Sequence, residues 1–378
     1  MSRNGITRRG VLRGTAAVGL LGVVGTPSVS AQEVDMTIAS AFEPGHINVE
    51  ASEMFAEAIA EETDGDVGVE VVPGGAYGAE DEIGELVAER GVEAHAAGTF
   101  PYFQYSPDYW FFGNPFVMED YDHLLRVMDS ELMEGGFEAM RENGNQRPIG
   151  QQIYRGLRHF TSNDPIQSPE DVEGLNLRLP ELDPWVQIWS EIGVDPTPIA
   201  LDELYTALET GTADASEGDT EQISAFNLFE VQDYLSMTGH LIETGNIYVN
   251  EDFFQELDEA HQDAFLEVGE EVTAEAAEIA IDREEDLIDE LADEGMGIVD
   301  DVDRDAFFDA GAPAVESLFE DQWVGTWDEV LEFTDEPDDE VDDEVDDDEV
   351  DDEVDDDEEM NDDDEEPGLN VLDEIRSM

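Results

Sequence analysis

Acidic side chains far outnumber basic ones in this chain. The sequence has 101 Asp and Glu against 14 basic residues, all of them arginine, and a formal net charge of -87. Nucleic acids and anionic lipid surfaces are excluded as partners, because both require a positive surface. The acids are spread along the whole chain, which favours adaptation to very high salt over one specific acidic binding face. At molar salt the Debye length falls to about 3 Å and the self-repulsion is screened, so we expect an extreme halophile.

The first 31 residues have the pattern of an export signal. Residues 7–13 (TRRGVLR) carry a twin-arginine signature, an apolar run follows over 16–24, and 29–31 offer small residues at the cleavage positions. Such a segment is removed on export. We therefore expect a twin-arginine signal peptide over 1–31 and an extracytoplasmic protein, at the cell surface or on the extracellular side of the membrane. The chain has no cysteine, which excludes disulfides, thiolate metal sites and lipid attachment through cysteine.

Strand-like and helix-like segments alternate through the body of the chain. Runs rich in β-branched residues at 34–42 and 67–72 flank a segment, 48–62, with apolar residues at helical spacing. This alternation is typical of an α/β fold with a largely parallel sheet. Further strands are expected at 149–163, 195–198, 241–250 and 295–300, and further helices at 79–91, 121–142, 184–193, 202–211, 252–294 and 304–333.

The composition changes completely after residue 334. Of the 32 residues from 335 to 366, 25 are Asp or Glu, in near-repeats of DDEV. Like charges at this density cannot pack into a core, so we expect a disordered acidic tail over 334–378. The repeats lack the glycine turn and the ligand spacing of a calcium loop, which predicts loose binding of counterions only. A role of the tail in contacts with the cell surface stays open.

The sequence contains no constellation that would carry catalysis or hold a metal. Zinc-protease, serine-hydrolase, Walker and dinucleotide-binding motifs are all missing, and the six histidines are scattered along the chain. Paired carboxylates carry no information in a chain this acidic. We therefore expect no catalytic residue, no metal site and no cofactor.

Three arginines in the middle of the chain are the strongest candidates for ligand binding. Arg178 lies in an apolar run closed by Pro180, and Arg155 and Arg158 lie in the expected strand 149–163. A buried guanidinium needs an anionic partner, and it holds a carboxylate through two parallel hydrogen bonds. That partner is either a ligand or one of the chain's own acids, and the residues alone leave both open. Residues three apart on a strand face opposite sides, so we expect at most one of Arg155 and Arg158 in a given pocket.

Molar salt screens an exposed ion pair, so a carboxylate site must be buried by the closure of two domains. The aromatic-dense segment 99–117, with Gly and Pro interleaved, is typical of a loop wall that faces a cleft, and core packing is an equal alternative. Phe100 and Phe103 of this segment, together with Trp185, are the aromatic candidates for a ligand wall.

The segments GLNLRLPE (174–181), DPTPIALDELYTALETGTADASEGD (195–219) and FEVQDYLSMTGH (229–240) carry a family resemblance. The chain resembles the solute-binding subunit of tripartite ATP-independent periplasmic (TRAP) transporters, of the DctP type, from about Thr37 to Trp323. The resemblance implies a periplasmic-binding-protein-like clamp of two α/β domains, joined by crossing strands and a long hinge-spanning helix. Residues 32–155 with 244–283 would form the first domain and the hinge helix, and 156–243 with 284–333 the second domain.

The resemblance also implies roles for single residues. Arg178 falls on the family's carboxylate-binding arginine, and Arg158 falls on a second arginine that supports it. Leu201 falls on a pocket wall position, and Glu80 lies near a polar position of the first domain. These residues and the aromatic candidates are expected to surround the ligand.

Two positions depart from the family pattern. Gly218, which follows Glu217, stands where the family has an asparagine that hydrogen-bonds ligand, so that contact is expected to be lost or taken by water or backbone. Glu181 stands at a position that is a polar ligand contact in some relatives, where a carboxylate would repel an acidic group or accept from a hydroxyl. We expect specificity to differ here. The complete set of candidate ligand-binding residues is Arg178, Arg158, Glu181, Leu201, Glu217, Gly218, Glu80, Phe100, Phe103 and Trp185.

These observations predict an extracytoplasmic receptor, not an enzyme, that binds a small organic carboxylate and delivers it to the permease subunits of a TRAP transporter. We expect a monomer with no nucleic-acid partner. The alternative is a secreted lyase or hydrolase that acts on an acidic sugar, with Glu181 or Glu217 as the general base. The sequence does not name the ligand.

Overall fold

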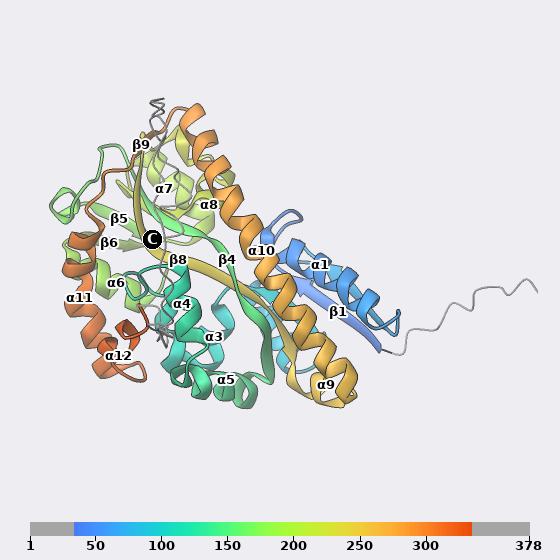
Figure 1. Ribbon diagram of the computed structural model, residues 1–378. Helices are drawn as coiled ribbons and strands as arrows, with labels where there is room; N and C mark the ends of the chain where they lie inside the picture. Colours follow the sequence, from blue (N-terminus) through green and yellow to red (C-terminus); the bar gives the residue numbers. More distant parts are fainter. Residues whose placement is uncertain (1–33, 335–378) are drawn as a thin grey trace, which may run out of the picture.

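The computed structural model describes residues 34–334. The expected signal peptide over 1–31 and the expected acidic tail beyond residue 334 lie outside the described residues. Between these limits the chain forms two α/β lobes that share two long strands and one long helix (Figure 1). The expected α/β clamp is therefore confirmed.

One sheet of seven strands runs through both lobes, in the order β2-β1-β3-β8-β4-β7, with β9 paired to β8. In the first lobe β1 (Val34–Ser40) pairs in parallel with both β2 (Val67–Val72) and β3 (Ala94–Ala97). Beyond β3 the sheet becomes antiparallel, through β8 and β4. The sheet is thus mixed and not largely parallel, because the two shared strands run in opposite directions.

Strands β4 (Gln146–Ser162) and β8 (Tyr234–Asn250) have 17 residues each and cross from one lobe to the other. They pair antiparallel from Gln146 opposite Asn250 to Ser162 opposite Tyr234. In the second lobe β7 (Ser216–Asp219) pairs antiparallel with β4, and β9 (Gly297–Val299) pairs in parallel with β8. This ribbon is the covalent connection between the two halves of the clamp.

Helix α10 (Glu259–Asp293) has 35 residues and lies along β4 and against α1 (Ile47–Glu62), spanning both lobes (Figure 1). Its close approach to β4 depends on two glycines. A Cβ at Gly150 would lie 2.3 Å from the Gly269 carbonyl oxygen, a distance that no side chain tolerates. The helix therefore rests directly on the backbone of the crossing strand.

The expected helix over 121–142 is two helices, α4 (Tyr121–Met128) and α5 (Glu131–Gly144). The break lies at Asp129 and Ser130, and Ser130 has an extended backbone at the start of α5. The Ser130 hydroxyl donates to the Val127 carbonyl oxygen over 2.6 Å and so satisfies one of the last acceptors of α4. The apolar periodicity continues across the break, which is why the sequence pattern did not reveal it.

The remaining elements of the first lobe are α2 (Glu80–Ala88), α3 (Phe100–Tyr105) and α9 (Glu251–Glu256). The aromatic-dense segment forms α3 and a following 3-10 helix, Pro107–Gly113. Tyr102, Phe111, Phe112 and Phe116 are fully buried core residues. The two alternatives for this segment, core and cleft wall, therefore apply to different residues within it.

The second lobe is built around a small parallel sheet of β5 (Asn176–Leu179) and β6 (Asp195–Pro198). Its helices are α6 (Asp183–Ile192), α7 (Leu204–Thr210), α8 (Thr220–Ala225), α11 (Arg304–Asp321) and α12 (Trp327–Leu331). Leu204, Leu208 and Ile223 form a separate small core with Leu235 and Leu291. Helices α11 and α6 pack together at the outer side of this lobe (Figure 1).

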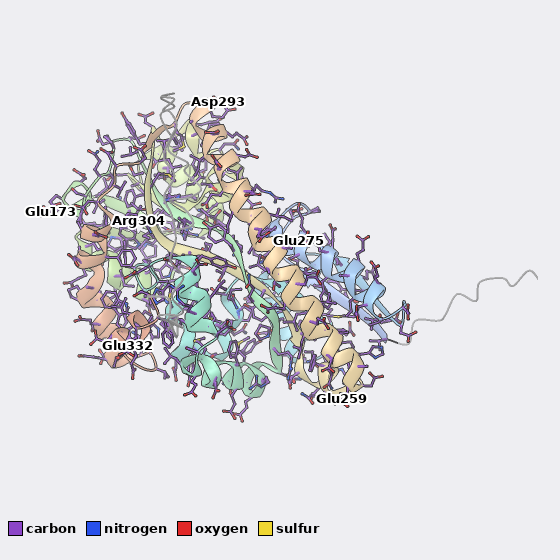
Figure 2. The ribbon with its side chains drawn as sticks, viewed as in Figure 1. Glu173, Glu259, Glu275, Asp293, Arg304 and Glu332 are labelled. Carbon is purple, nitrogen blue, oxygen red and sulfur yellow. The ribbon has the colours of Figure 1, made fainter. Side chains whose placement is uncertain are left out.

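Acidic side chains project from the periphery of both lobes, as Glu173, Glu259, Glu275, Asp293 and Glu332 illustrate in Figure 2. All five are exposed. The acid excess is thus a property of the solvated surface and not of one face. Among residues 34–334, no helix has the length and apolar character that crossing a membrane would require.

Candidate functional site

A cavity of about 330 Å³ lies between the two lobes, and both of them contribute to its wall. The first lobe supplies Phe42, Glu80 and the aromatic loop, and the second lobe supplies β5, the start of α6 and part of α8. The crossing strands β4 and β8 close the cavity between them. Residues at its wall are Phe42, Glu80, Gly98, Thr99, Phe100, Phe103, Trp110, Gly113, Arg155, Arg158, Arg178, Pro180, Leu182, Trp185, Leu201, Asp219, Gln222, Leu241, Ile242 and Glu243.

Arg178 is held at the cavity wall by the backbone of the second lobe. It lies in β5 opposite Thr197, its backbone N–H donates to Ala215, and its Nε donates to the Ile199 carbonyl oxygen over 2.9 Å. The residue is 2 % exposed. No carboxylate of the described residues forms an ion pair with it. Burial lowers the pKa of the Arg178 guanidinium, Arg158 adds to this effect, and the charge of Glu217 offsets it only in part.

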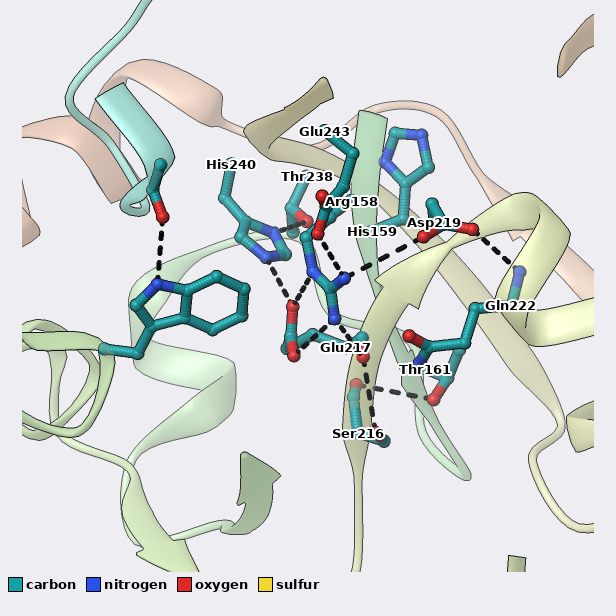
Figure 3. Close-up of polar contacts among 12 residues, drawn as sticks. Arg158, His159, Thr161, Ser216, Glu217, Asp219, Gln222, Thr238, His240 and Glu243 are labelled. Atoms are coloured by element: carbon teal, nitrogen blue, oxygen red, sulfur yellow. Dashed lines mark hydrogen bonds and ion pairs between the residues drawn. The ribbon is translucent and has the colours of Figure 1, made fainter. Parts of the chain in front are cut away.

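Arg158, in contrast, is fully paired inside the protein (Figure 3). Its Nε donates to Glu217 Oε2 over 2.6 Å, its Nη2 donates to Glu217 Oε1 over 2.9 Å, and its Nη1 donates to Glu243 Oε1 over 2.7 Å. Burial opposes the charge, but Glu217 and Glu243 together raise the pKa of Arg158 above its usual value. The guanidinium also lies over the Trp185 ring, 5.0 Å from its centroid. Arg158 therefore has little capacity left for a ligand.

Glu217 forms the centre of a buried polar chain (Figure 3). His240 Nε2 lies 3.2 Å from Glu217 Oε2, and His240 Nδ1 lies 2.8 Å from the Thr238 hydroxyl. Burial lowers the pKa of His240, so the neutral imidazole donates from Nε2 and accepts from Thr238 at Nδ1. Burial alone would raise the pKa of Glu217, but Arg158 and the His240 hydrogen bond lower it to about 2. A carboxylate with this pKa is a poor general base, which removes one of the two expected candidates for that role.

Arg155 lines the same cavity as Arg158, so the expectation that at most one of them could do so is wrong. The reason is an irregularity in β4. Tyr154 is opposite Thr244 and Gly156 is opposite Glu243, so Arg155 is an extra residue that the partner strand does not match. One extra residue reverses the alternation of side chains from that point onward.

Glu284 of helix α10 forms hydrogen bonds to residues on both sides of this bulge. Its Oε1 accepts from the Leu157 backbone N–H over 2.8 Å, and its Oε2 accepts from the Tyr154 hydroxyl. Gly156, which lies between them, has φ +124°, in the region that L side chains rarely adopt. The long helix therefore fixes the local geometry that orients both arginines.

Glu80 and Arg155 form the polar part of the wall near the first lobe. Glu80 Oε1 accepts from the Gly98 backbone N–H over 2.6 Å, and burial raises the pKa of Glu80. Arg155 Nη1 lies 3.5 Å from Glu243 Oε2, and its guanidinium lies over the Phe42 ring, 4.8 Å from the centroid. Burial also raises the pKa of Asp219, on the opposite lobe. Glu80, Arg155, Glu243, Arg158 and Asp219 thus mix both signs of charge along one wall.

The apolar part of the wall is made of aromatic and aliphatic side chains from both lobes. Phe103 packs on Trp110, with ring centroids 4.9 Å apart, and Phe100 packs on Phe103 at 5.6 Å. Trp185 is fixed by its Nε1, which donates to the Gly113 carbonyl oxygen over 3.1 Å. Leu201, at 43 % exposure, is an exposed large apolar residue of the wall. These surfaces can cover the non-ionic part of a small molecule.

Seven of the ten candidate ligand-binding residues lie together at this wall, namely Arg178, Arg158, Leu201, Glu80, Phe100, Phe103 and Trp185. The structure does not bring the other three to the wall. Glu181 is exposed, because it follows Pro180 as the chain leaves β5. Glu217 lies behind the wall with its oxygens bound to Arg158 and His240. Gly218 also lies off the wall, and the side chain of Gln222 occupies the space beside it.

Several wall residues were not among the candidates. Arg155 is one of the three arginines that the sequence singles out, but strict alternation along the strand argues against its presence beside Arg158. Asp219, Gln222 and Glu243 carry no distinguishing sequence signal, because acidic and polar residues surround them throughout the chain. Trp110 belongs to the aromatic segment, and only its position next to Thr99 and Phe103 distinguishes it from the buried rings around it.

A family model described as DctP, bacterial extracellular solute-binding protein, family 7, matches residues 38–322 of the chain. A solute-binding protein of Roseobacter denitrificans is 28 % identical over 317 residues, which are 80 % of this chain and 93 % of that protein. A sialic acid-binding periplasmic protein of Vibrio cholerae is 30 % identical over 184 residues, which are 49 % of this chain and 57 % of that protein.

Solved structures of similar proteins have the same fold. A TRAP periplasmic solute-binding protein from Roseobacter denitrificans, with bound L-galactonate, has a TM-score of 0.68 and 26 % identity over 80 % of this chain and 99 % of that one. Another, from Polaromonas, bound to D-erythronate, has a TM-score of 0.70 and 25 % identity over 80 % of this chain and all of that one. The two-lobed arrangement around a central cavity is thus shared with proteins whose structures contain a bound hydroxy acid.

Proposed function

The chain belongs to the DctP family of bacterial extracellular solute-binding proteins, and from this premise we propose that it is the receptor for a small organic carboxylate in a TRAP transport system. The ligand carboxylate would bind Arg178, and the rest of the ligand would fill the cavity between the lobes. The receptor would then deliver it to the membrane permease. The two relatives with solved structures contain L-galactonate and D-erythronate, both of which are carboxylates with several hydroxyl groups.

The difference between Arg178 and Arg158 carries this proposal. Both are buried at the cavity wall, yet Arg158 has two carboxylates within hydrogen-bonding distance and Arg178 forms no ion pair with the described residues. A buried guanidinium without a counter-charge is unfavourable. A ligand carboxylate would supply that charge, with the two parallel hydrogen bonds that a guanidinium offers.

The position of the cavity supports a clamp mechanism. The wall is formed by both lobes, so movement of the lobes about β4, β8 and α10 would open and close it. Closure would exclude bulk salt and so preserve the ion pair at high ionic strength. We also propose that the two moving domains have the boundaries expected from the sequence. Residues 32–155 and 244–283 would form the first domain with the hinge helix, and 156–243 and 284–333 the second domain.

We also propose the finer features of the cellular setting. Proteins of this family act outside the cytoplasm, and the pattern of residues 7–31 supports export by the twin-arginine route. The exposed acids of both lobes support adaptation to high salt in a halophilic source (Figure 2). A monomer with separate permease subunits is the expected form.

Calorimetric titration in molar KCl tests the proposal, with L-galactonate, D-erythronate, D-glucuronate and succinate as probes. We expect Arg178→Lys to weaken binding of the best probe by roughly a hundredfold or more, because one partner of a buried ion pair loses its paired geometry. The matched control is Arg90→Lys, at an exposed arginine paired with Glu256 on the surface, which should leave affinity unchanged. Equal affinity of Arg178→Lys and the unmodified protein would overturn the assignment of the carboxylate site.

A further inference from the structure

Gln222 carries a hydrogen-bond donor without a partner among the described residues, on a side chain that belongs to the cavity wall. It lies in the first turn of α8 and belongs to the cavity wall. Its Nε2 is buried and has no hydrogen-bond partner among the described residues. A buried donor without an acceptor costs free energy, so this amide is expected to find its acceptor in a bound molecule.

The side chain is not needed for the local fold. The start of α8 is capped by Asp219, whose Oδ1 accepts from the Gln222 backbone N–H over 2.7 Å. That cap involves the backbone of Gln222 only. The cap therefore leaves the side-chain carboxamide of Gln222 available to bind a ligand.

Gly218 leaves the space that this carboxamide occupies. A Cβ at Gly218 would lie 2.5 Å from Gln222 Nε2 and 3.1 Å from its Cδ. The backbone of Gly218 is not in the left-handed region, so the lack of a side chain there serves space and not conformation. The side-chain amide of Gln222, four residues further along the chain, thus fills the space that a side chain at position 218 would occupy.

Other polar groups of the cavity wall indicate what Gln222 would bind. Arg155 Nε, on the same wall, is a second buried donor without a partner. Glu80, Asp219 and Glu243 add carboxylate acceptors to this part of the wall. A ligand hydroxyl group can accept a hydrogen bond from these amide and guanidinium donors and can donate one to these carboxylates. A second carboxylate on the ligand would instead meet three acids, because Arg155 and Arg158 on this wall are already paired with Glu243 and Glu217.

We propose that Gln222 is a ligand-binding residue that determines specificity, donating from Nε2 to a hydroxyl oxygen of a polyhydroxylated monocarboxylate. This inference rests on the proposed function, since it places the ligand carboxylate at Arg178. Gly218 contributes by leaving room for the amide. The pair selects hydroxylated acids over dicarboxylates and over aliphatic acids.

A double-mutant cycle tests the proposal with the full chain in molar KCl. Gln222→Ala is expected to weaken binding of L-galactonate, D-erythronate or D-glucuronate, whichever binds best, by about tenfold, as the loss of one hydrogen bond to a ligand. Gly218→Ala is expected to weaken it as well, because the new Cβ displaces the flexible amide. In the Gln222→Ala background, Gly218→Ala should have less than about a twofold effect. Unchanged affinity of Gln222→Ala, or equal effects of Gly218→Ala in both backgrounds, would overturn the proposal.

The same titrations separate this inference from the function on which it rests. If Arg178→Lys abolishes binding and Gln222→Ala does not alter it, the carboxylate site holds and the role of Gln222 fails. If succinate or butyrate binds better than every hydroxylated acid of the panel, the ligand class inferred here fails and the receptor function holds. If no carboxylate binds, the proposed function fails.

Discussion

Arg155 and Arg158 are three residues apart on one strand, yet both side chains line the same cavity. The extra residue in β4 between Tyr154 and Gly156 changes the face to which the later side chains point. The bulge thus brings a third guanidinium to the wall, beside those of Arg158 and Arg178. It also lies where α10 crosses the strand, so the geometry of the site depends on the element that spans the two lobes.

We expect Gly156→Ala to reduce both stability and ligand affinity. Gly156 has φ +124°, and an L residue there is strained, which costs on the order of 1 kcal/mol or more. The strain would also move Arg155. The matched control is Gly174→Ala, at a positive-φ glycine with open space around it. It should reduce stability, measured by urea unfolding in molar KCl, and leave affinity intact. Loss of affinity in both variants would contradict the role of the bulge.

The two partners of the central ion pair should differ in their effect on stability. Arg158→Leu leaves Glu217, at 0 % exposure, without its guanidinium and should cost about 3–5 kcal/mol. Glu217→Gln should cost less, since Arg158 retains Glu243 at 2.7 Å. Urea unfolding measures both. In the Arg158→Leu background, Glu217→Gln should recover stability, because it removes the isolated charge. A larger loss in Glu217→Gln than in Arg158→Leu would be inconsistent with this pairing.

The stability contributed by Glu217 should disappear in acid. Its pKa is about 2 in the folded protein against 4.5 ordinarily, so between these values the unfolded chain binds more protons and stability falls as pH falls. The advantage of the unmodified protein over Glu217→Gln should be fully present above about pH 4.5 and decline toward pH 2. Unfolding free energies measured across this range decide the matter. A constant difference between the two proteins would show that Glu217 ionises in the folded state as it does in the unfolded one.

Glu284 should have the opposite dependence on pH. Burial raises its pKa from 4.5 to about 7, with Tyr154, Leu157, Asp219 and, at 4.0 Å, His159 around it. The folded protein then binds more protons between these values, so stability falls as pH rises from 4.5 to about 7. Relative to Glu284→Gln, the unmodified protein should lose stability across this window.

Glu290→Gln, at an exposed glutamate of the same helix, is the control for Glu284→Gln and should show no such change. If Glu284→Gln follows the unmodified protein at every pH, Glu284 ionises in the folded state as it does in the unfolded one. Ligand affinity should be measured on the same samples, because Glu284 also holds the bulge at Gly156.

Salt should stabilise this protein strongly. The formal net charge of -87 repels itself, and raising KCl from 0.1 to 1 M shortens the Debye length from about 10 to about 3 Å. We expect the midpoint of thermal unfolding to rise steeply over this range. Sucrose at matched osmolality is the control, since it stabilises without screening charge. An equal rise in sucrose and in KCl would argue against charge repulsion as the cause.

The spacing of apolar residues predicted helices and strands well where local sequence determines secondary structure. The strands at 34–42 and 67–72 and the helix at 48–62 agree with β1, β2 and α1 to within two residues. The prediction of one helix over 121–142 was wrong, because the chain forms two helices there. The Ser130 hydroxyl bonds to the end of α4, although the apolar pattern continues past this point. Arg178 stood out by itself, as a cation in an apolar run of an acidic chain.

The sequence by itself determined the α/β alternation, the acidic surface, the family and the arginine for which an anion is expected. These follow from periodicity and from residue types that are rare in this chain. Only the tertiary structure decided which arginine is already neutralised, because Glu217 and Glu243 are two acids among 101 and lie 59 and 85 residues from Arg158. Only the tertiary structure shows that the Gln222 side chain lies beside Gly218 and that Arg155 lines the cavity. Such contacts depend on a one-residue bulge and on strand pairing over long separations, which local pattern does not specify.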